Sequence, residues 1–474
     1  MVFSSLTFLC VFLPVAFVLD ALLPSVRARN RLLILVSLLF YAYGEPVYVL
    51  LMIASTVVNY AMGRAIGHAT SSGRSGRAWL VAALVLNLGA LAVFKYADML
   101  VETLNALLGP LGWGVLPQPQ IALPVGISFF TFQALSYVID VWRGEVEPQR
   151  SYPAILLYVS FFPQLIAGPI VKYHDIERQI YSRSLDAGEA ARGMRRFCVG
   201  LAKKVLIANV MASAADVLFA YAPEELNAAA AWVACLAYLM QIYFDFSGYS
   251  DMAIGLGHMF GFSFRENFDH PYASVSIKEF WRRWHISLST WFRDYLYIPL
   301  GGNRRGSVRT CLNKCLVFLL CGLWHGASWT FVVWGAIHGV FIMLEEVIDV
   351  RRLPRALGRL YTMLVVACAF VIFRADTLGQ GIGVLGRMFG GWDFSHASMA
   401  VLLPQLTPLF VVTFVVACVA CLPVGKTVWA RLRPEGRGTA TVDGLSYAGA
   451  VVLLVACMLS LSGGGYNPFI YFRF

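Results

Sequence analysis

Charged residues are scarce in this chain: only 14% of its 474 residues are Asp, Glu, Lys or Arg, whereas 59% are hydrophobic. Soluble globular proteins carry about 25% charged residues, so this chain has too few charges to cover a surface that faces water. It also lacks any polar segment that is long enough to form a soluble domain. A soluble protein is therefore excluded, and any chemistry must take place within a membrane or at its edge.

Several catalytic and binding motifs are absent as well. The chain has no Gly-x-Ser-x-Gly nucleophile elbow and no His-x-x-x-x-Asp acyltransferase motif. Gly425-Lys426-Thr427 resembles the end of a phosphate-binding loop, but Ala420 replaces the first glycine, so ATP-driven transport has no support. The ten cysteines have neither the spacing of a disulfide framework nor that of a common zinc site, and we expect no bound metal.

Long apolar runs recur from one end of the chain to the other, and the mean hydropathy is +0.68. A run of about 20 residues can span roughly 30 Å of hydrocarbon, where backbone groups must be satisfied within helices. We therefore predict an all-α polytopic bundle of about 10–13 spans, some of them broken or re-entrant. The first run, 3–23, lacks the basic start and the cleavage site of a signal peptide, so we expect a retained helix.

The net charge of +10 is distributed over loops between these runs. Because Lys and Arg mark cytoplasmic loops, both basic loops near the N-terminus lie inside only if 32–62 crosses twice, turning at Gly44-Glu45-Pro46. That topology places the N-terminus outside. The basic residues are explained by topology and by lipid headgroups, and their scatter between spans speaks against nucleic-acid binding.

Three apolar blocks contain residues that plain lipid-facing helices avoid. Pro124 and Gly126 are expected to open a helix that carries Gln133, and 161–170 reads as a broken helix. The block 241–251 contains Asp245, Ser247 and Asp251, whose carboxylates should face the interior of the bundle. Internal hydrogen bonds that only fix the fold explain these blocks as well as catalysis does.

The segment 276–295 has aromatic residues at helical spacing and basic residues around the remaining surface. This pattern predicts an amphipathic helix at the cytoplasmic headgroups, with His285 on the aromatic face beside Trp284. The following turn carries Asn303 and Arg304, which suit either a phosphate group or lipid headgroups.

The segment 315–344 contains no Asp, Glu, Lys or Arg. Thirty residues of helix would reach about 45 Å, so we predict a tilt or a break near Gly326. His325 should lie deep in the membrane next to Trp324, where its imidazole can stay neutral and act as a general base. His338 lies roughly 220° around a continuous helix, so it need not share the same site.

The blocks 280–295 and 323–326 together closely resemble the membrane-bound O-acyltransferases, in particular their bacterial branch that acetylates exported polysaccharides. The segments 167–169, 244–251 and 467–472 are similar to the same branch. The resemblance implies one acyltransferase domain over 1–474, with a family core at about 120–345 and peripheral helices at 1–119 and 346–474. It also implies a helical bundle around a central tunnel, with His325 as the invariant histidine and His285 as the second polar position.

The same resemblance implies a route for the acyl group. A thioester donor, such as acetyl-CoA or an acyl carrier, supplies it on the cytoplasmic side of the bacterial inner membrane. A periplasmic partner protein receives it and modifies an exported polysaccharide such as alginate. No tightly bound cofactor is expected, and membrane lipids are the remaining partners.

We therefore predict that His325 removes the proton from an acceptor hydroxyl as that hydroxyl attacks the thioester carbonyl. His285 would orient the donor or polarise the carbonyl. The alternatives are a transporter or channel that uses buried Asp and His residues, a scaffold that anchors an extracellular enzyme, and D-alanyl transfer to teichoic acid within the family. The candidates for the tunnel or the donor site are Trp284, Ser287, Trp324, Asp245, Ser247, Asp251, Gln133, Asn303 and Arg304.

Overall fold

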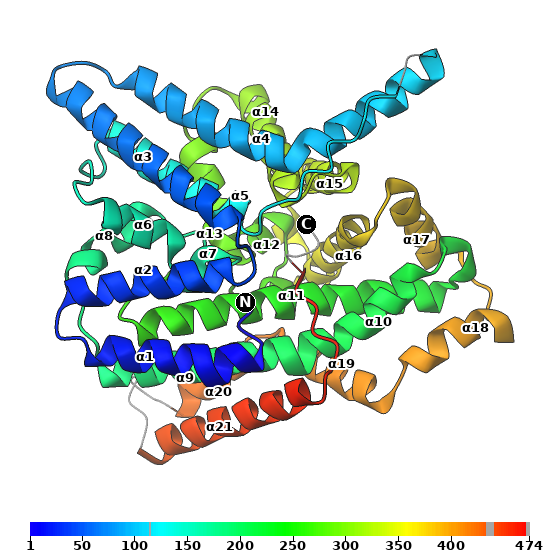
Figure 1. The fold of residues 1–474 in the computed structure, drawn as a ribbon. Helices are drawn as coiled ribbons and strands as arrows, with labels where there is room; N and C mark the ends of the chain where they lie inside the picture. The colour runs from blue at the N-terminus through cyan, green and yellow to red at the C-terminus, as the bar shows by residue number, and fades with distance from the viewer. Residues whose placement is uncertain (113–114, 433–439, 471–474) are drawn as a thin grey trace. The chain divides into compact units, whose positions relative to one another are not determined.

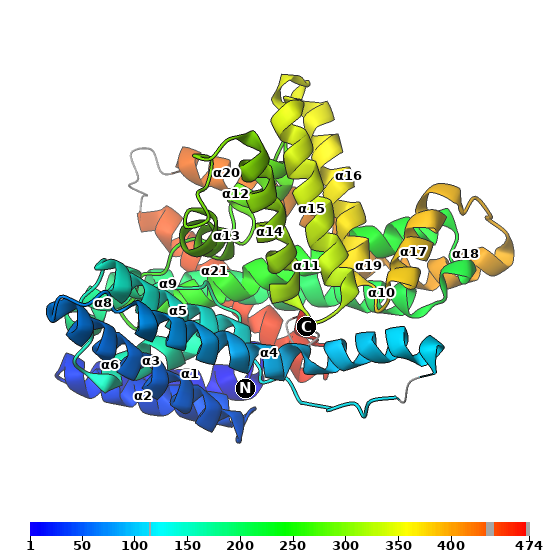
Figure 2. The same ribbon diagram turned by 90° about the horizontal axis from the view of Figure 1, so that it is seen from above.

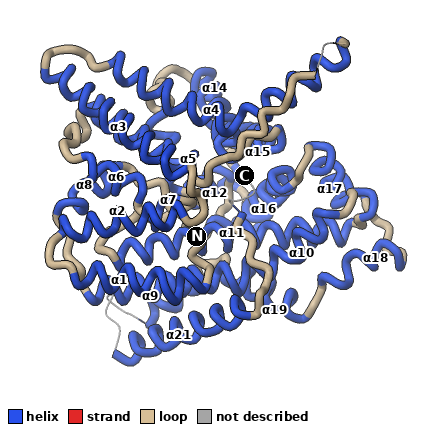
Figure 3. The backbone as a smooth tube through the Cα atoms, in the orientation of Figure 1, coloured by secondary structure: helices blue, strands red, loops and turns tan. Residues whose placement is uncertain are grey.

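A computed structural model describes residues 1–112, 115–432 and 440–470 of the chain. These residues form helices, turns and loops, and none of them lies in a β-strand (Figure 3). The predicted all-α class is therefore confirmed.

The chain folds into two compact units, which are described separately. Unit 1 comprises Met1–Met194 and Ala253–Arg265, and unit 2 comprises Arg195–Met252 and Glu266–Phe474. Helices α9 (Ala187–Ala202) and α11 (Ala228–Met259) contribute residues to both units. The prediction of one acyltransferase domain stays a prediction.

The other helices of unit 1 are α1 (Leu13–Leu22), α2 (Val26–Ala42), α3 (Tyr48–Ser71), α4 (Arg77–Leu108), α5 (Ile127–Arg143), α6 (Tyr152–Ser160), α7 (Phe162–Leu165) and α8 (Tyr173–Tyr181). Those of unit 2 are α10 (Asn209–Ala220), α12 (Ile277–Arg283), α13 (Ile286–Phe292), α14 (Ser307–His325), α15 (Trp329–Val347), α16 (Arg355–Arg374), α17 (Leu378–Gly390), α18 (His396–Leu402), α19 (Pro408–Ala420), α20 (Val424–Leu432) and α21 (Ala440–Ser462).

Eight helical segments of the described ranges are long and apolar enough to cross a membrane. A ninth results if the bent pair Ser398–Gln405 and Pro408–Ala420 is one span. Other apolar runs form shorter helices: the first is Phe8–Leu22, and 153–171 divides into α6, α7 and loop. Broken and short helices therefore account for the difference from the predicted 10–13 spans.

The helix boundaries in unit 1 follow the predicted turns. The run 32–62 is interrupted between α2 and α3, at the predicted Gly44-Glu45-Pro46. Helix α5 begins directly after Gly126, which has a φ of +79°. A Cβ atom at Gly126 would lie 2.9 Å from the Leu165 carbonyl oxygen, so both the backbone conformation and the close approach require glycine.

Helices α14, α15 and α16 lie side by side in unit 2 (Figures 1 and 2). The predicted break is confirmed, because α14 ends at His325 and Gly326 takes an extended conformation. Ser328 then caps α15 by accepting a hydrogen bond from the Thr330 backbone amide. Helices α14 and α15 pack backbone to backbone at Gly322 and Gly335. A Cβ at Gly322 would lie 2.2 Å from the Phe331 carbonyl oxygen, and one at Gly335 would lie 2.3 Å from the Phe318 carbonyl oxygen.

The predicted continuous helix over 276–295 is wrong. Helix α12 ends at Arg283, Trp284 is extended, and α13 begins at Ile286. His285 lies between the two helices with a φ of +44°, a left-handed backbone conformation that residues other than glycine rarely adopt. The neighbouring loop holds this break open, because the Ile286 backbone amide donates a hydrogen bond to the carbonyl of Asn267.

Candidate active site

His325 is the last residue of α14 and only 7% of its surface is exposed. Its ring centroid lies 5.0 Å from that of Trp324, 5.1 Å from that of Trp334 and 5.3 Å from that of Phe373. These rings come from α14, α15 and α16, so the hairpin and the next helix together surround the imidazole. His325 is therefore buried within the protein, and its predicted depth in the membrane stays a prediction.

His285 is fully buried beside His325, with 6.3 Å between the two ring centroids. Its ring also lies 4.6 Å from Phe246 of α11 and 5.7 Å from Trp324. We call Phe246, Trp284, Trp324, Trp334, Phe370 and Phe373, which surround the two histidines, the aromatic enclosure. The break between α12 and α13 thus turns His285 toward His325.

The side chain of Asn267 fixes the orientation of His285. Its Oδ1 atom accepts hydrogen bonds from the backbone amide of Ser287 (3.1 Å) and from the Ser287 hydroxyl (2.9 Å), and lies 3.2 Å from His285 Nδ1. Because Oδ1 is an acceptor, His285 Nδ1 must carry the proton, and Nε2 presents a lone pair. Nε2 is buried and has no hydrogen-bond partner among the described residues.

Burial also determines the charge of His285. Removal from water disfavours the imidazolium and lowers the pKa of His285 to about 3. The ring is therefore neutral at the pH of a cell, and its Nε2 atom remains a hydrogen-bond acceptor.

His338 lies closer to the two histidines than the continuous-helix geometry suggested. The break at Gly326 reverses the chain, and α15 runs back along α14. The Trp281 indole N–H donates to His338 Nδ1 at 3.2 Å. Trp334 contacts both His338 and His325, with centroid distances of 5.0 and 5.1 Å.

A small cavity, which we call the histidine cavity, adjoins His325. Its volume is about 10 Å³, close to the minimum that holds one water molecule. Its walls are hydrophobic or aromatic except for the imidazole itself, and they comprise Ile242, Phe246, Trp284, His325, Trp334, Phe370, Phe373 and Ile470.

The polar candidates from α11 lie in different surroundings. Asp245 is buried and forms an ion pair with Lys204 at 2.9 Å. Asp251 instead pairs with Arg196 at 2.8 Å and with Lys203 at 2.6 Å. Ser247 is buried, and its hydroxyl has no hydrogen-bond partner within the described part of the chain. These contacts bind Asp251 into an ion-pair network, in line with a structural role.

Gln133 belongs to unit 1, whereas both histidines belong to unit 2. Its side chain is fully buried in α5, and neither amide atom has a hydrogen-bond partner among the described residues. Its assignment to the tunnel stays a prediction.

A second cavity of unit 2, which we call the large cavity, has a volume of about 1060 Å³. Its walls come from the segments 275–311, 314–321 and 342–351. Trp281, the tryptophan that donates to His338, is part of its lining. Asn303 lines it as well and accepts a hydrogen bond from the Tyr297 hydroxyl, whereas exposed Arg304 is not among the lining residues.

Acidic and basic side chains both line the large cavity, and most of them pair with each other. Glu346 pairs with Lys278 at 2.8 Å and also with Lys314. Glu345 accepts hydrogen bonds from the backbone amides of Ile277 and Lys278. Arg282 is the basic lining side chain for which the described residues supply no carboxylate, so its charge faces the cavity.

Sequence reasoning missed Asn267, Trp334, Lys204 and Ile470. Lys204 lies within an apolar run, which indicates that it needs a buried acidic partner. The segment 467–472 suggests no role beyond its resemblance to the family. Asn267 lies in a loop 18 residues before His285, and no spacing rule connects the two.

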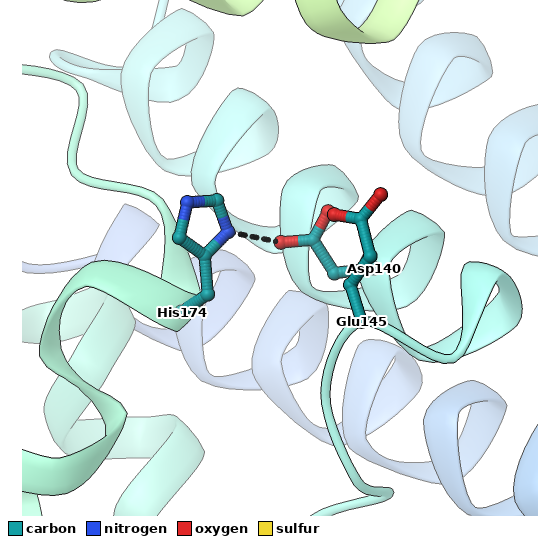
Figure 4. A group of neighbouring side chains, drawn as sticks. All are labelled: Asp140, Glu145 and His174. Atoms are coloured by element: carbon teal, nitrogen blue, oxygen red, sulfur yellow. Dashed lines mark hydrogen bonds and ion pairs between the residues drawn. The ribbon is translucent and has the colours of Figure 1, made fainter.

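One group of possible metal ligands occurs among the described residues, and it lies in unit 1 (Figure 4). The ligand atoms of Asp140, Glu145 and His174 are all within 4.8 Å of one another. His174 Nδ1 and Asp140 Oδ2 are 3.0 Å apart and form a hydrogen bond. That bond to the buried Asp140 carboxylate raises the pKa of His174 above its ordinary value, and Asp175, 3.4 Å from Nε2, adds to the effect.

Comparison with known proteins assigns the chain to a class. Residues 125–375 match the membrane-bound O-acyltransferase family. The chain is 41% identical to the probable alginate O-acetylase AlgI of Pseudomonas putida, and the alignment covers 100% of both proteins. It is 37% identical to the peptidoglycan O-acetyltransferase of Helicobacter pylori, over 84% of this chain and 82% of that protein.

A more remote relative is the teichoic acid D-alanyltransferase of Bacillus subtilis, which is 28% identical over 48% of this chain and 62% of its own length. The chain belongs to the membrane-bound O-acyltransferase family. It is a multi-pass membrane enzyme that transfers an acyl group to a hydroxyl. Of the alternatives drawn from the sequence, these relatives support acyl transfer rather than transport or a scaffold.

Replacing Asn267 by leucine should destabilise the site. Leucine leaves the Ser287 backbone amide and His285 Nδ1 without their acceptor, which costs about 1–3 kcal/mol in free energy of unfolding. Ser250→Ala leaves one buried donor, the Asn267 amide group, without its acceptor, and should therefore cost less than the loss of two acceptor contacts in Asn267→Leu. Denaturation of the purified proteins in detergent measures both, and equal losses would contradict this role of Oδ1.

The His174–Asp140 hydrogen bond should make stability depend on pH. Because folding raises the pKa of His174, its stabilisation is complete below the unfolded value of about 6.5 and is lost as pH rises through the raised value. Wild type should therefore exceed His174→Gln in melting temperature at pH 6, and the gap should shrink toward pH 9. A gap that widens with pH would contradict this assignment.

Proposed function

We propose that this enzyme passes an acetyl group from a cytoplasmic thioester donor across the membrane for the O-acetylation of an exported polysaccharide such as alginate. The acetyl group would cross the bacterial inner membrane through this protein and pass to a periplasmic partner that acts on the polymer. The close approach of His285 and His325 inside the aromatic enclosure, with 6.3 Å between ring centroids, is the observation that carries the proposal. Full-length similarity to probable alginate O-acetylases supports the choice of acetyl group and polymer.

In this proposal His325 is the general base. As the acceptor hydroxyl attacks the thioester carbonyl, its proton moves to the imidazole, and the thiolate leaves and takes up a proton. A positioned base of this kind contributes roughly 10²–10⁴ in rate. The enclosure supports this role because its rings keep bulk water away from the imidazole.

His285 orients the reacting groups through its Nε2 lone pair. With the proton on Nδ1, this atom accepts a hydrogen bond from the acceptor hydroxyl or from an amide N–H of the donor. Polarising the carbonyl would require a proton on Nε2, which the contacts of Asn267 oppose. The tautomer therefore favours orientation over the alternative of carbonyl polarisation.

The donor would approach through the large cavity. A coenzyme A thioester carries phosphates, and Arg282 presents a positive charge there that no carboxylate of the described residues pairs with. The loops at 265–314 and 351–359 are rich in Lys and Arg, which favours the cytoplasmic side. Trp281 lines the large cavity and lies 5.7 Å from Trp334, which lines the histidine cavity, so the thioester would reach His325 past these two rings.

The test of this function replaces His325 by alanine in a strain that lacks the chromosomal gene. We expect the wild-type gene to restore acetyl groups on the exported alginate, measured by mass spectrometry, and the His325→Ala gene to leave them at background. His396→Ala, at an exposed histidine of α18, is the matched control and should restore acetylation fully.

Normal acetylation by a folded, membrane-inserted His325→Ala protein would contradict the role of the imidazole. The relative from Helicobacter pylori points to a second acceptor, and the same strains distinguish it. If the peptidoglycan loses acetyl groups while the alginate keeps them, alginate is the wrong polymer.

Arg282→Gln should weaken donor binding. We expect KM for acetyl-CoA, added to the protein in liposomes at low salt, to rise about tenfold with little change in kcat, because a charge-assisted contact is lost. Arg359→Gln, at an exposed position of α16 outside the large cavity, should leave KM unchanged. An unaltered KM in Arg282→Gln would place the donor elsewhere.

A further inference from the structure

The segment Asn467–Ile470 lies inside unit 2 and is held there by buried polar groups. The backbone amide of Ile470 donates to Asp245 Oδ2 at 2.9 Å, and the Lys204 ammonium group donates to the carbonyl of Pro468. The Asn209 amide group donates to Asn467 Oδ1 at 3.1 Å. This segment, which we call the tail, is thus held at three points.

The tail explains the position of the Lys204–Asp245 ion pair. The two side chains are only 3% and 1% exposed, and a pair this deep gains little stability over a hydrophobic one because both charges lose their water. It does provide an acceptor and a donor for backbone groups of the tail, which would otherwise be buried without partners. The pair therefore acts on the position of Ile470.

Ile470 is part of the wall of the histidine cavity. Most of the remaining wall is formed by aromatic rings that brace one another: Trp334 and Phe373 are 5.0 Å apart, and Phe370 and Phe373 are 5.9 Å apart. Ile470 lies outside helices α1–α21, and its location depends on the polar contacts of the tail. It is the wall residue that can change without disturbing the packing of the helices.

We propose that the histidine cavity receives the methyl end of the acyl group and that Ile470 limits the enzyme to acyl groups of two carbons. This inference rests on the proposed role of His325. A carbonyl that reacts beside His325 would place its alkyl end in the adjoining cavity, which has room for about one water molecule and has Ile470 in its wall. Lys204 and Asp245 are positioning residues that hold this wall in place.

The chemistry of the cavity wall also disfavours an aminoacyl group. The eight lining side chains include no carboxylate, so the ammonium group of a D-alanyl thioester would lose its water without gaining a counter-charge. The wall therefore matches a short, uncharged acyl group and favours acetyl over D-alanyl.

The experiment compares acetyl-, propionyl- and butyryl-CoA, each labelled in the acyl group, as donors for the protein in liposomes. The readout is the ratio of propionyl to acetyl transfer, which loss of stability alone does not change. One additional methylene in an apolar pocket is worth about 10- to 200-fold in discrimination, so wild type should favour acetyl at least tenfold.

Ile470→Ala removes three carbon atoms from the wall and should raise the propionyl-to-acetyl ratio about tenfold, with butyryl transfer becoming detectable. Ile470→Val, a smaller change that is safer for folding, should raise it about threefold. Ile372→Ala is the matched control, since this isoleucine is equally buried in unit 2 but does not line the cavity. Its ratio should equal that of wild type.

Lys204→Met should also raise the propionyl-to-acetyl ratio. Lys204→Arg, which keeps the hydrogen-bond donor and the positive charge, should keep the wild-type ratio. An unchanged ratio in Ile470 variants that still transfer acetyl would overturn this inference alone. Folded Ile470→Ala and Ile470→Val proteins that transfer none of the three groups would also overturn it, because the side chain would then serve the reaction itself. Failure of the wild-type protein to use any thioester would overturn the proposed function, and this inference with it.

Discussion

Two imidazole rings that are held out of water by aromatic side chains form the arrangement on which the rest of the structure depends. Each ring stands at an interruption of the helical backbone: His325 ends α14, and His285 occupies a left-handed position between α12 and α13. Interrupted backbone that is removed from water needs surrounding protein to satisfy its polar groups. The hairpin of α14 and α15 and the neighbouring α16 supply that surrounding, since the rings that flank His325 come from these three helices.

The buried polar groups around this centre hold backbone and rings in place. Asn267 connects the ring of His285 to the start of α13, and the Lys204–Asp245 pair connects two helices to the tail that carries Ile470. Each of these groups costs free energy to bury unless its hydrogen-bonding capacity is used. These buried polar groups lie near the two histidines. They cost stability there and fix the geometry, as is common at functional sites.

That this is a membrane protein, and that its chain breaks after His325, could be predicted from the sequence because both depend on composition and length. Scarce charges imply a membrane protein, and an uncharged run longer than the membrane implies the break after His325. The interruption at His285 could not be predicted, since the spacing of Trp281, Trp284 and Leu288 fits a continuous helix. Tertiary hydrogen bonds to Asn267 override that local preference.

Two further outcomes depended on contacts that no spacing rule describes. The buried carboxylates of α11 looked alike in sequence, but Asp245 anchors the tail whereas Asp251 joins an ion-pair network with Arg196 and Lys203. The angle of roughly 220° between His325 and His338 holds only for a continuous helix. It does not apply here because the chain reverses at Gly326. In both cases the deciding partner comes from another part of unit 2.

The central claim is that the thioester carbonyl reacts inside the aromatic enclosure, next to His325 and His285. The most direct measurement is a cryo-electron microscopy structure of the protein in lipid with acetonyl-CoA, a donor analogue that cannot be cleaved. Our account predicts the ketone inside the aromatic enclosure, with its carbon about 3–3.5 Å from a position at which a hydroxyl can donate a hydrogen bond to His325. An analogue that is fully bound with its ketone outside an unchanged enclosure would contradict the account.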